Sequence, residues 1–236
     1  VKESLDVNGT IKLDGNYPTG TGNVALGDAA LSSGSLSGGN NTVIGRSVGA
    51  ANTSGADNTA MGSFSLCANI SGDSNTAIGR SALRANTTAD NNTAVGLSAL
   101  SANTTGASNV AVGSCALLCN ISGAENTVVG MNAARLTTGS ANVAVGHSAL
   151  EDNTSGASNT ALGREALHTN TTASNNVAVG KRALYLNTTG TTNTALGKDA
   201  LNNNTTASDN TAVGTSALTA NTTGTSNVAV GASALK

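Results

Sequence analysis

A short series of cations has the residue types and spacing of an anion-binding ridge. Three of its members are seventeen residues apart in the sequence, and the fourth directly follows the second. Guanidinium and ammonium groups bind carboxylates, sulfates and phosphates, so we take these residues as candidate contacts to a receptor on a target surface, such as an acidic glycan. The candidate receptor-binding residues are Arg164, Lys181, Arg182 and Lys198. The alternative is a solvated face that Glu165 and Asp199 partly neutralise.

Histidine and cysteine offer little further chemistry. The chain has two His and three Cys, and Cys115 and Cys119 are spaced as a pair that could bind a metal. In the repeat described below, however, His147 and His168 lie two or more repeats away from that pair. We therefore expect no metal, no cofactor and no catalytic group, and we predict that the protein is not an enzyme. We interpret Cys67, Cys115 and Cys119 as free thiols.

A repeat of seventeen residues organises the chain. Thirteen copies of Asn-(Thr/Val)-(Ala/Val)-aliphatic-Gly follow one another from Asn23, and they are seventeen residues apart except for one interval of eighteen and one of sixteen. We number each copy from its glycine, which is position 0. The glycines are Gly27, Gly45, Gly62, Gly79, Gly96, Gly113, Gly130, Gly146, Gly163, Gly180, Gly197, Gly214 and Gly231. So regular a period indicates a repeat architecture.

Each copy predicts a short strand followed by turns. Thr or Val, Ala and a second aliphatic residue favour an extended backbone, whereas glycine and Asn-Thr-Thr-Gly segments favour turns. Such short connections leave no room for a crossover helix, so successive copies can only stack as coils. We predict an all-β parallel β-solenoid of about thirteen coils over residues 23–236, roughly 60 Å long at the usual strand spacing. Residues 1–22 form a lead-in with a hairpin signal at residues 7–10. The irregular intervals are expected in turns.

Stacking turns each repeat position into a column of like side chains. We expect Asn at position −4 to form an amide ladder, and the aliphatic residues at position −1 to fill the interior. Ala at position +3 and Leu at position +4 are neighbours, so an extended chain would send one of them outward. We expect Leu to face out and to form an apolar stripe that further copies cover, which favours a homotrimer. The alternative is a corner that turns both inward. The variable position +1 is expected to face solvent.

Composition excludes several classes of function. The net charge is −2 with 10% charged residues, which disfavours nucleic acid as a partner. No apolar run is long enough to insert into a membrane, and no signal peptide is visible. One Phe, two Tyr and no Trp leave few aromatic platforms for sugar rings, so carbohydrate binding by this segment is a weak expectation. The chain starts at Val1 and its repeats continue to Lys236, so we expect it to be a piece of a longer protein.

The repeat resembles known fibre proteins. NTAIG at Asn75, NTAVG at Asn92 and NVAVG at Asn109 are similar to the repeats of trimeric autotransporter adhesin heads. The longer pattern NTAVGxSALxxNTTG, and the LDVNG segment from Leu5, resemble phage tail fibres that often end in an intramolecular chaperone domain. The unit is longer than the usual adhesin-head repeat, and no chaperone domain is present in this sequence. The resemblance implies a β-roll, left-handed in those heads, a homotrimer and an extracellular place on a virion or a bacterial cell surface.

These observations predict a structural and adhesive segment of a trimeric fibre. Its partners would be two identical chains and a molecule on the surface of a host or target cell, such as a glycan. An ice-binding solenoid is the competing class, because regular columns of Thr could order water. A monomeric repeat scaffold is the third alternative, and the mass of the protein in solution distinguishes it from a fibre.

Overall fold

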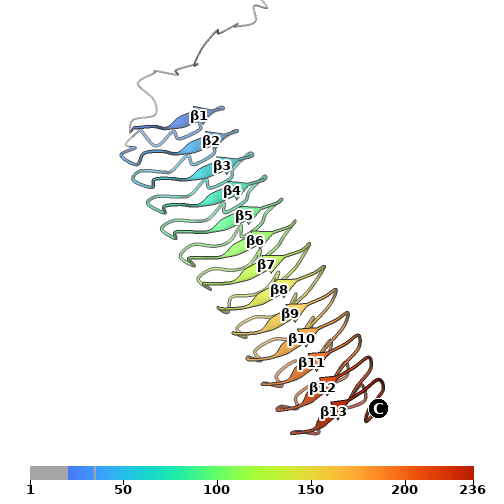
Figure 1. Cartoon of the computed structure of the whole chain (residues 1–236). Coiled ribbons are helices and arrows are strands. Elements are labelled where there is room, and N and C mark those ends of the chain that lie inside the picture. The colour runs from blue at the N-terminus through green and yellow to red at the C-terminus, as the bar shows by residue number, and fades with distance from the viewer. Residues whose placement is uncertain (1–20, 35) are drawn as a thin grey trace, which may run out of the picture.

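The computed structural model describes residues 21–34 and 36–236 as a β-solenoid (Figure 1). Thirteen strands of three residues form one parallel sheet in which each strand pairs with the next along the chain, and the described residues contain no helix. The strands are β1 (Val24–Leu26), β2 (Thr42–Ile44), β3 (Thr59–Met61), β4 (Thr76–Ile78), β5 (Thr93–Val95), β6 (Val110–Val112), β7 (Thr127–Val129), β8 (Val143–Val145), β9 (Thr160–Leu162), β10 (Val177–Val179), β11 (Thr194–Leu196), β12 (Thr211–Val213) and β13 (Val228–Val230). The predicted all-β parallel solenoid is confirmed, whereas the hairpin predicted at residues 7–10 lies outside the described residues.

The register of the sheet follows the sequence repeat. Thr93 pairs with Val110, which is the residue seventeen positions later. The longer interval pairs Val24 with Thr42 and the shorter one pairs Thr127 with Val143, and both leave the three-residue strands intact. The prediction that length changes fall in the turns is therefore confirmed. Turns can absorb an extra or missing residue because they lie outside the ladder of strand hydrogen bonds.

The strands point their side chains in the direction opposite to the one predicted. Ala94 and Ala111, at position −2, are fully buried, whereas Leu162 at position −1 has 44% of its surface exposed. Positions −3 and −1 share the outer side of the sheet because side chains alternate along a strand. The prediction that position −1 fills the interior is wrong. The coil is narrow, and a small side chain at position −2 leaves space for a larger one that enters from the opposite wall.

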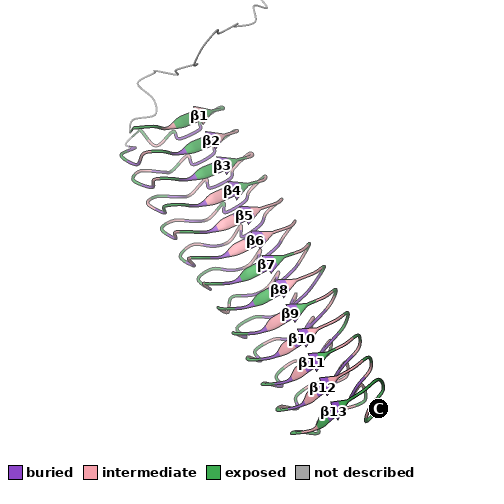
Figure 2. Cartoon of the chain, viewed as in Figure 1, coloured by how far each residue is buried: buried purple, intermediate pink, exposed green. Residues whose placement is uncertain are grey.

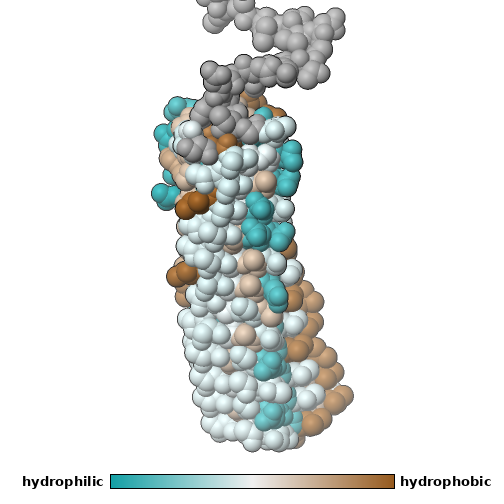
Figure 3. Space-filling view, turned by 90° about the vertical axis from the view of Figure 1, so that its left-hand side faces the viewer, coloured by the Kyte–Doolittle hydropathy of each residue, from teal (hydrophilic) through white to brown (hydrophobic). Residues whose placement is uncertain are grey.

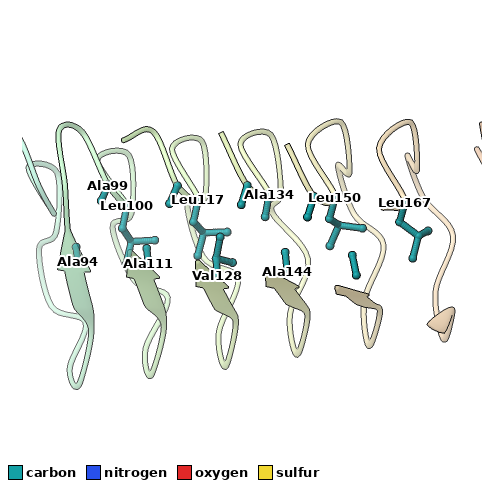
Figure 4. Packing of buried hydrophobic residues seen from close by; sticks show 14 of the residues in the cluster. Ala94, Ala99, Leu100, Ala111, Leu117, Val128, Ala134, Ala144, Leu150 and Leu167 are labelled. Carbon is teal, nitrogen blue, oxygen red and sulfur yellow. The ribbon is translucent and has the colours of Figure 1, made fainter. Parts of the chain in front are cut away.

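That larger side chain is the leucine at position +4. Leu100 and Leu117 are fully buried, and so are Ala99 and Ala116 at position +3 (Figure 4). The eleven leucines at position +4 adopt φ between 49° and 57°, which is the left-handed region. Alternation of side chains holds only for an extended backbone, so this corner sends both neighbours inward. The predicted outward leucine stripe is wrong, and the alternative of an inward corner is right.

The glycine at position 0 permits the coils to approach closely. Gly96 has a φ of 136°, and a Cβ atom added to it would lie 2.5 Å from the carbonyl oxygen of Gly113 in the next coil. Only glycine adopts this backbone readily, and only glycine leaves space for the neighbouring backbone. The repeated glycine is thus required twice, by its own conformation and by the coil that stacks on it.

Two columns of buried asparagine connect the coils. At position −4, the backbone N–H of Asn109 donates to Oδ1 of Asn92 at 2.9 Å, and Nδ2 of Asn109 donates to the carbonyl of Gly123 at 2.9 Å. The predicted ladder is confirmed. A second ladder at position +7 was not predicted, and in it Nδ2 of Asn103 donates to Oδ1 of Asn86 at 3.1 Å. Both ladders supply the partners that buried amides need.

The second ladder is interrupted in the sixteen-residue coil. Thr137 occupies position +7 there, and Nδ2 of Asn153 lies 3.4 Å from its hydroxyl oxygen. The preceding Asn120 donates normally to Asn103, but its buried Oδ1 has no hydrogen-bond partner among the described residues. A threonine hydroxyl is too short to replace the amide that would reach this oxygen. The contacts on either side of Thr137 therefore lack an amide hydrogen bond that the coils around them have.

We predict that Thr137→Asn stabilises the protein. The new amide would donate to Oδ1 of Asn120 and accept from Asn153, and satisfying a buried acceptor contributes about 1–3 kcal/mol. Urea unfolding followed by circular dichroism should show a higher midpoint. Thr105→Asn, at an exposed turn residue whose side chain forms no hydrogen bond among the described residues, is the control and should leave the midpoint unchanged. An unchanged or lower midpoint for Thr137→Asn would contradict this account of the ladder.

We predict that two leucines differ strongly in their contribution to stability. Leu117→Ala removes a fully buried side chain and should lower the free energy of unfolding by about 2–5 kcal/mol. Leu97→Ala removes a side chain that is 50% exposed and should cost less than about 1 kcal/mol. Chemical denaturation measures both, and equal losses would refute the inward corner at position +4.

Candidate functional site: the outer surfaces of the rod

The first candidate surface is the outer side of the sheet, which we call the sheet face. It consists of the residues at positions −3 and −1 of β1–β13, and none of the thirteen strands contains a charged residue. Position −3 is Thr in eight strands and Val in five, and position −1 is always aliphatic. Met61 and Leu196 are 46% and 37% exposed. The outer positions of the strands are exposed or half-buried (Figure 2), and Figure 3 shows apolar side chains gathered along one side of the lower half of the rod.

The second surface is a cation edge, defined as positions +1, +2 and +5. Every described Lys and Arg lies on it, at the side of the sheet where the strands end. These residues are Arg46, Arg80, Arg84, Arg135, Arg164, Lys181, Arg182, Lys198 and Lys236. Position +1 contains five of these cations and one acid, Asp28. Most residues at position +1 are exposed and the rest are half-buried, which confirms the prediction that this position faces solvent.

The structure brings the four candidate receptor-binding residues together on this edge. The four residues follow β9, β10 and β11. The carboxylate of Glu165 accepts hydrogen bonds from two of the four, Arg164 and Arg182. Arg182 Nε lies 2.7 Å from Oε2 of Glu165, and Arg164 Nη2 lies 2.8 Å from its Oε1. Lys198 lies 3.4 Å from Asp199. Lys181 is exposed and forms no ion pair with the described residues. The ridge is therefore present, and acids of the same edge partly neutralise it.

Glu165 is the acidic residue that connects two cations of this group. Its side chain is only 13% exposed, and hydrogen bonds from Arg182 and then Arg164 lower the pKa of Glu165 from its ordinary value of 4.5 to about 2. Opposite charges and donors favour the ionised form, which is the physical cause of the shift. The carboxylate contacts both guanidinium groups, so two cations of the ridge are connected through one acid of the same chain.

A second group of stacked side chains was not predicted. Position +5 carries Arg135, Glu151, His168 and Tyr185 in four consecutive coils. Arg135 Nε lies 3.0 Å from Glu151, His168 Nε2 lies 3.6 Å from the same carboxylate, and the rings of His168 and Tyr185 are 5.2 Å apart. Arg182 lies over the Tyr185 ring at 5.3 Å, which joins both groups. The available signal was the run of unusual residues in one column.

Burial and hydrogen bonding act in opposite directions on Glu151. Burial raises the pKa of Glu151, but hydrogen bonds from Ser148 and Arg135, together with the nearby His168, lower it, and the result is a pKa below the ordinary value of 4.5. The carboxylate therefore stays ionised at neutral pH, between a cation and a histidine. Asp152 contacts the other ring nitrogen of His168 at 3.7 Å.

The third surface is an acid edge, defined as positions −5 and −6, at the side of the sheet where the strands begin. It contains no described Lys or Arg. Its acidic residues are Asp57, Asp73, Asp90, Glu125 and Asp209. Two of these acids also hold the turns together, because Oδ1 of Asp73 accepts from the backbone of Ala56 at 2.7 Å and Oδ1 of Asp90 accepts from the backbone of Asp73 at 2.7 Å. The two edges of the sheet thus differ in the sign of their charge.

Other kinds of site have little support in the described residues. The three cysteines are free thiols, and no group of three or more His, Cys, Asp and Glu residues is arranged to hold a metal ion within the described ranges. No helix in the described ranges has the length and hydropathy to cross a membrane. Comparison of the chain with protein-family models, with curated proteins and with solved structures found no match. A functional proposal must therefore rest on the three surfaces.

We predict that the contribution of Glu165 to stability depends on pH. Its pKa is lower in the folded protein, so its stabilising effect is present above about pH 4.5 and is lost as the pH falls toward about 2. Glu165→Gln should lower the melting temperature at pH 7, and the difference from wild type should shrink over that range. Glu125→Gln, which changes an exposed carboxylate without an ion pair among the described residues, should show no such trend. A difference that does not depend on pH would argue against the ion pairs.

Proposed function

We propose that the chain is a rigid segment of a homotrimeric fibre, on a phage tail or a bacterial cell surface, that positions or forms an element for attachment to a host. The sheet face is the observation that carries this proposal. It is uncharged, it is apolar at position −1 in every coil, and it runs along all thirteen strands. Exposed apolar surfaces of this extent mark sites of association.

The dimensions of the sheet face suit association with copies of the same chain. Twelve strand spacings and three-residue strands give a face of roughly 58 Å by 10 Å, or about 600 Å². A stable interface buries about 800 Å² on each partner, so an interface built on the sheet face would also have to include residues of its flanking corners. Identical chains usually associate around a closed symmetry axis, and the fibres that the repeat resembles are trimers. The outward leucine stripe no longer supports the trimer, and the sheet face replaces it.

Host contact is proposed for the cation edge around β9–β11. Arg164, Lys181, Arg182 and Lys198 lie there, outside the sheet face, so assembly would leave room for a partner. Tyr185, which lies under the Arg182 guanidinium, adds a half-buried ring that could support a sugar. A glycan or another anionic molecule on an outer surface fits these groups, and the corresponding location is extracellular.

Ice binding is the less favoured function. Thr occupies position −3 in eight strands, so part of the sheet face has a regular hydroxyl column. Val replaces it in five strands, and position −1 varies among Val, Leu, Ile and Met. A surface that orders water needs even side chains at constant spacing, whereas a surface that packs against protein tolerates such changes in size.

We predict a trimeric mass for the purified protein at micromolar concentration. Light scattering should give three times the 22.8 kDa of one chain. Val112→Glu combined with Val179→Glu places two charges on the sheet face and should yield monomers with an unchanged circular dichroism spectrum, because an unpaired charge is costly in an interface. Thr105→Glu combined with Thr172→Glu alters exposed turn residues instead and should remain trimeric. A monomeric wild-type protein would refute the proposal.

A further inference from the structure

The sheet face is bordered by edges of opposite charge. Position +1 lies two residues after each strand and position −5 lies two residues before it, so the cation edge and the acid edge flank the same apolar surface. The segregation is complete among the described cations, all of which lie on the cation edge. The acids are less completely separated, because Asp28, Glu151, Glu165 and Asp199 lie on the cation edge. The acid edge nevertheless carries acids and no described cation, and this difference between the two edges is what an assembly could use.

The symmetry of an assembly decides which edges meet. When rods stand parallel around a common axis with their sheet faces inward, the end of one strand lies beside the beginning of a strand in the next copy. The cation edge of each copy then faces the acid edge of its neighbour. When two rods pair in opposite directions by a twofold axis across them, like edges meet instead. The observed charges favour only the parallel arrangement.

The positions of the charges along the rod agree with parallel copies in register. Asp73 precedes β4 and Arg80 follows the same strand, so the two residues would meet at one level in neighbouring copies. Asp57 and Asp90 precede β3 and β5, and each would lie one coil from Arg80. Near the other end, Asp209 precedes β12 and Lys198 follows β11. One coil corresponds to about 5 Å, which long side chains can span.

We propose that copies of this chain associate in parallel and in register, with the acid edge of each copy paired to the cation edge of the next. This inference rests on the proposed homotrimer and specifies how its chains meet. The apolar sheet faces supply most of the affinity, and the charged edges select orientation and register, because exposed ion pairs contribute little individually and like-charge contacts disfavour wrong arrangements.

The pairing leaves one part of the cation edge free. The acid edge has no Asp or Glu in the turns that precede β8, β9, β10 and β11. Arg164 and Lys181 follow β9 and β10, so in register they would find no acid of the neighbouring copy within one coil. These two cations therefore remain available for the proposed contact with a host molecule, whereas Arg46, Arg80 and Lys198 take part in assembly. The pairing thus removes Lys198 from the residues proposed for host contact.

The first arm of the test reverses the acid edge. In the variant Asp57→Lys, Asp73→Lys, Asp90→Lys, the concentration at which half of the trimers dissociate should rise at least tenfold in about 20 mM salt. Salt screens exposed charges, so the difference should shrink in about 0.5 M salt. The matched control Thr88→Lys, Thr105→Lys, Ser122→Lys adds three lysines at exposed residues of position +9, outside positions −5 and −6 that define the acid edge, and should dissociate like wild type.

The second arm separates pairing from damage to the fold. Adding Arg46→Glu and Arg80→Glu to the reversed acid edge restores opposite charges across the interface. The dissociation concentration should then return to within about threefold of wild type. A margin of this size is allowed because the strength of an exposed ion pair varies with its context. Rescue cannot follow from a misfolded edge. A wild-type trimer that is insensitive to the reversal, or a charge swap without rescue, would overturn the pairing and leave the trimer intact. A monomeric wild-type protein would overturn both.

Discussion

The structure depends on one constraint, which is that each residue stacks on the equivalent residue of the next coil. A column can persist along the rod only if its side chain tolerates an identical neighbour at about 5 Å. Asparagine does so because an amide both donates and accepts, leucine and alanine do so by packing, and the glycine at position 0 does so because it has no side chain. A charged residue does so less readily, because like charges repel, and the cations Arg164, Lys181 and Lys198 stack only at an exposed position. Charges are accordingly found at the corners, and Glu165 separates the guanidinium groups of Arg164 and Arg182.

The same constraint explains what could be predicted from the sequence. The period, the strands, their register and the Asn ladder at position −4 follow from the spacing of residues alone. The direction of side chains does not, because the rule of alternation assumes an extended chain and Leu100 has a left-handed backbone with φ of 52°. Leucine is an unusual residue in that region, so the local sequence does not indicate the left-handed backbone at position +4. The clustering of the four cations followed from the period, but the contacts of His168 and Tyr185 depend on rotamers that no spacing specifies.

The interior is divided into two halves, and this division shapes the outer surface. One half is apolar and contains the small residues at position −2 with the Ala and Leu of the corner, and the other contains the two amide ladders that share the carbonyl at position +10, as at Gly106. So thin a core has no space for aromatic rings, which accounts for their scarcity. It also leaves the larger aliphatic side chains at position −1 on the outside, where they are exposed or half-buried.

The interrupted amide ladder has a mechanical consequence. In a stack where each coil contacts only its neighbours, resistance to force is set by the weakest interface and not by the average. The step from Asn120 past Thr137 to Asn153 lacks one amide contact, and it lies near the middle of the rod. Under tension along its length, we expect the rod to part there before it parts at the uninterrupted interfaces beside it, which would leave two blocks of coils that stay folded.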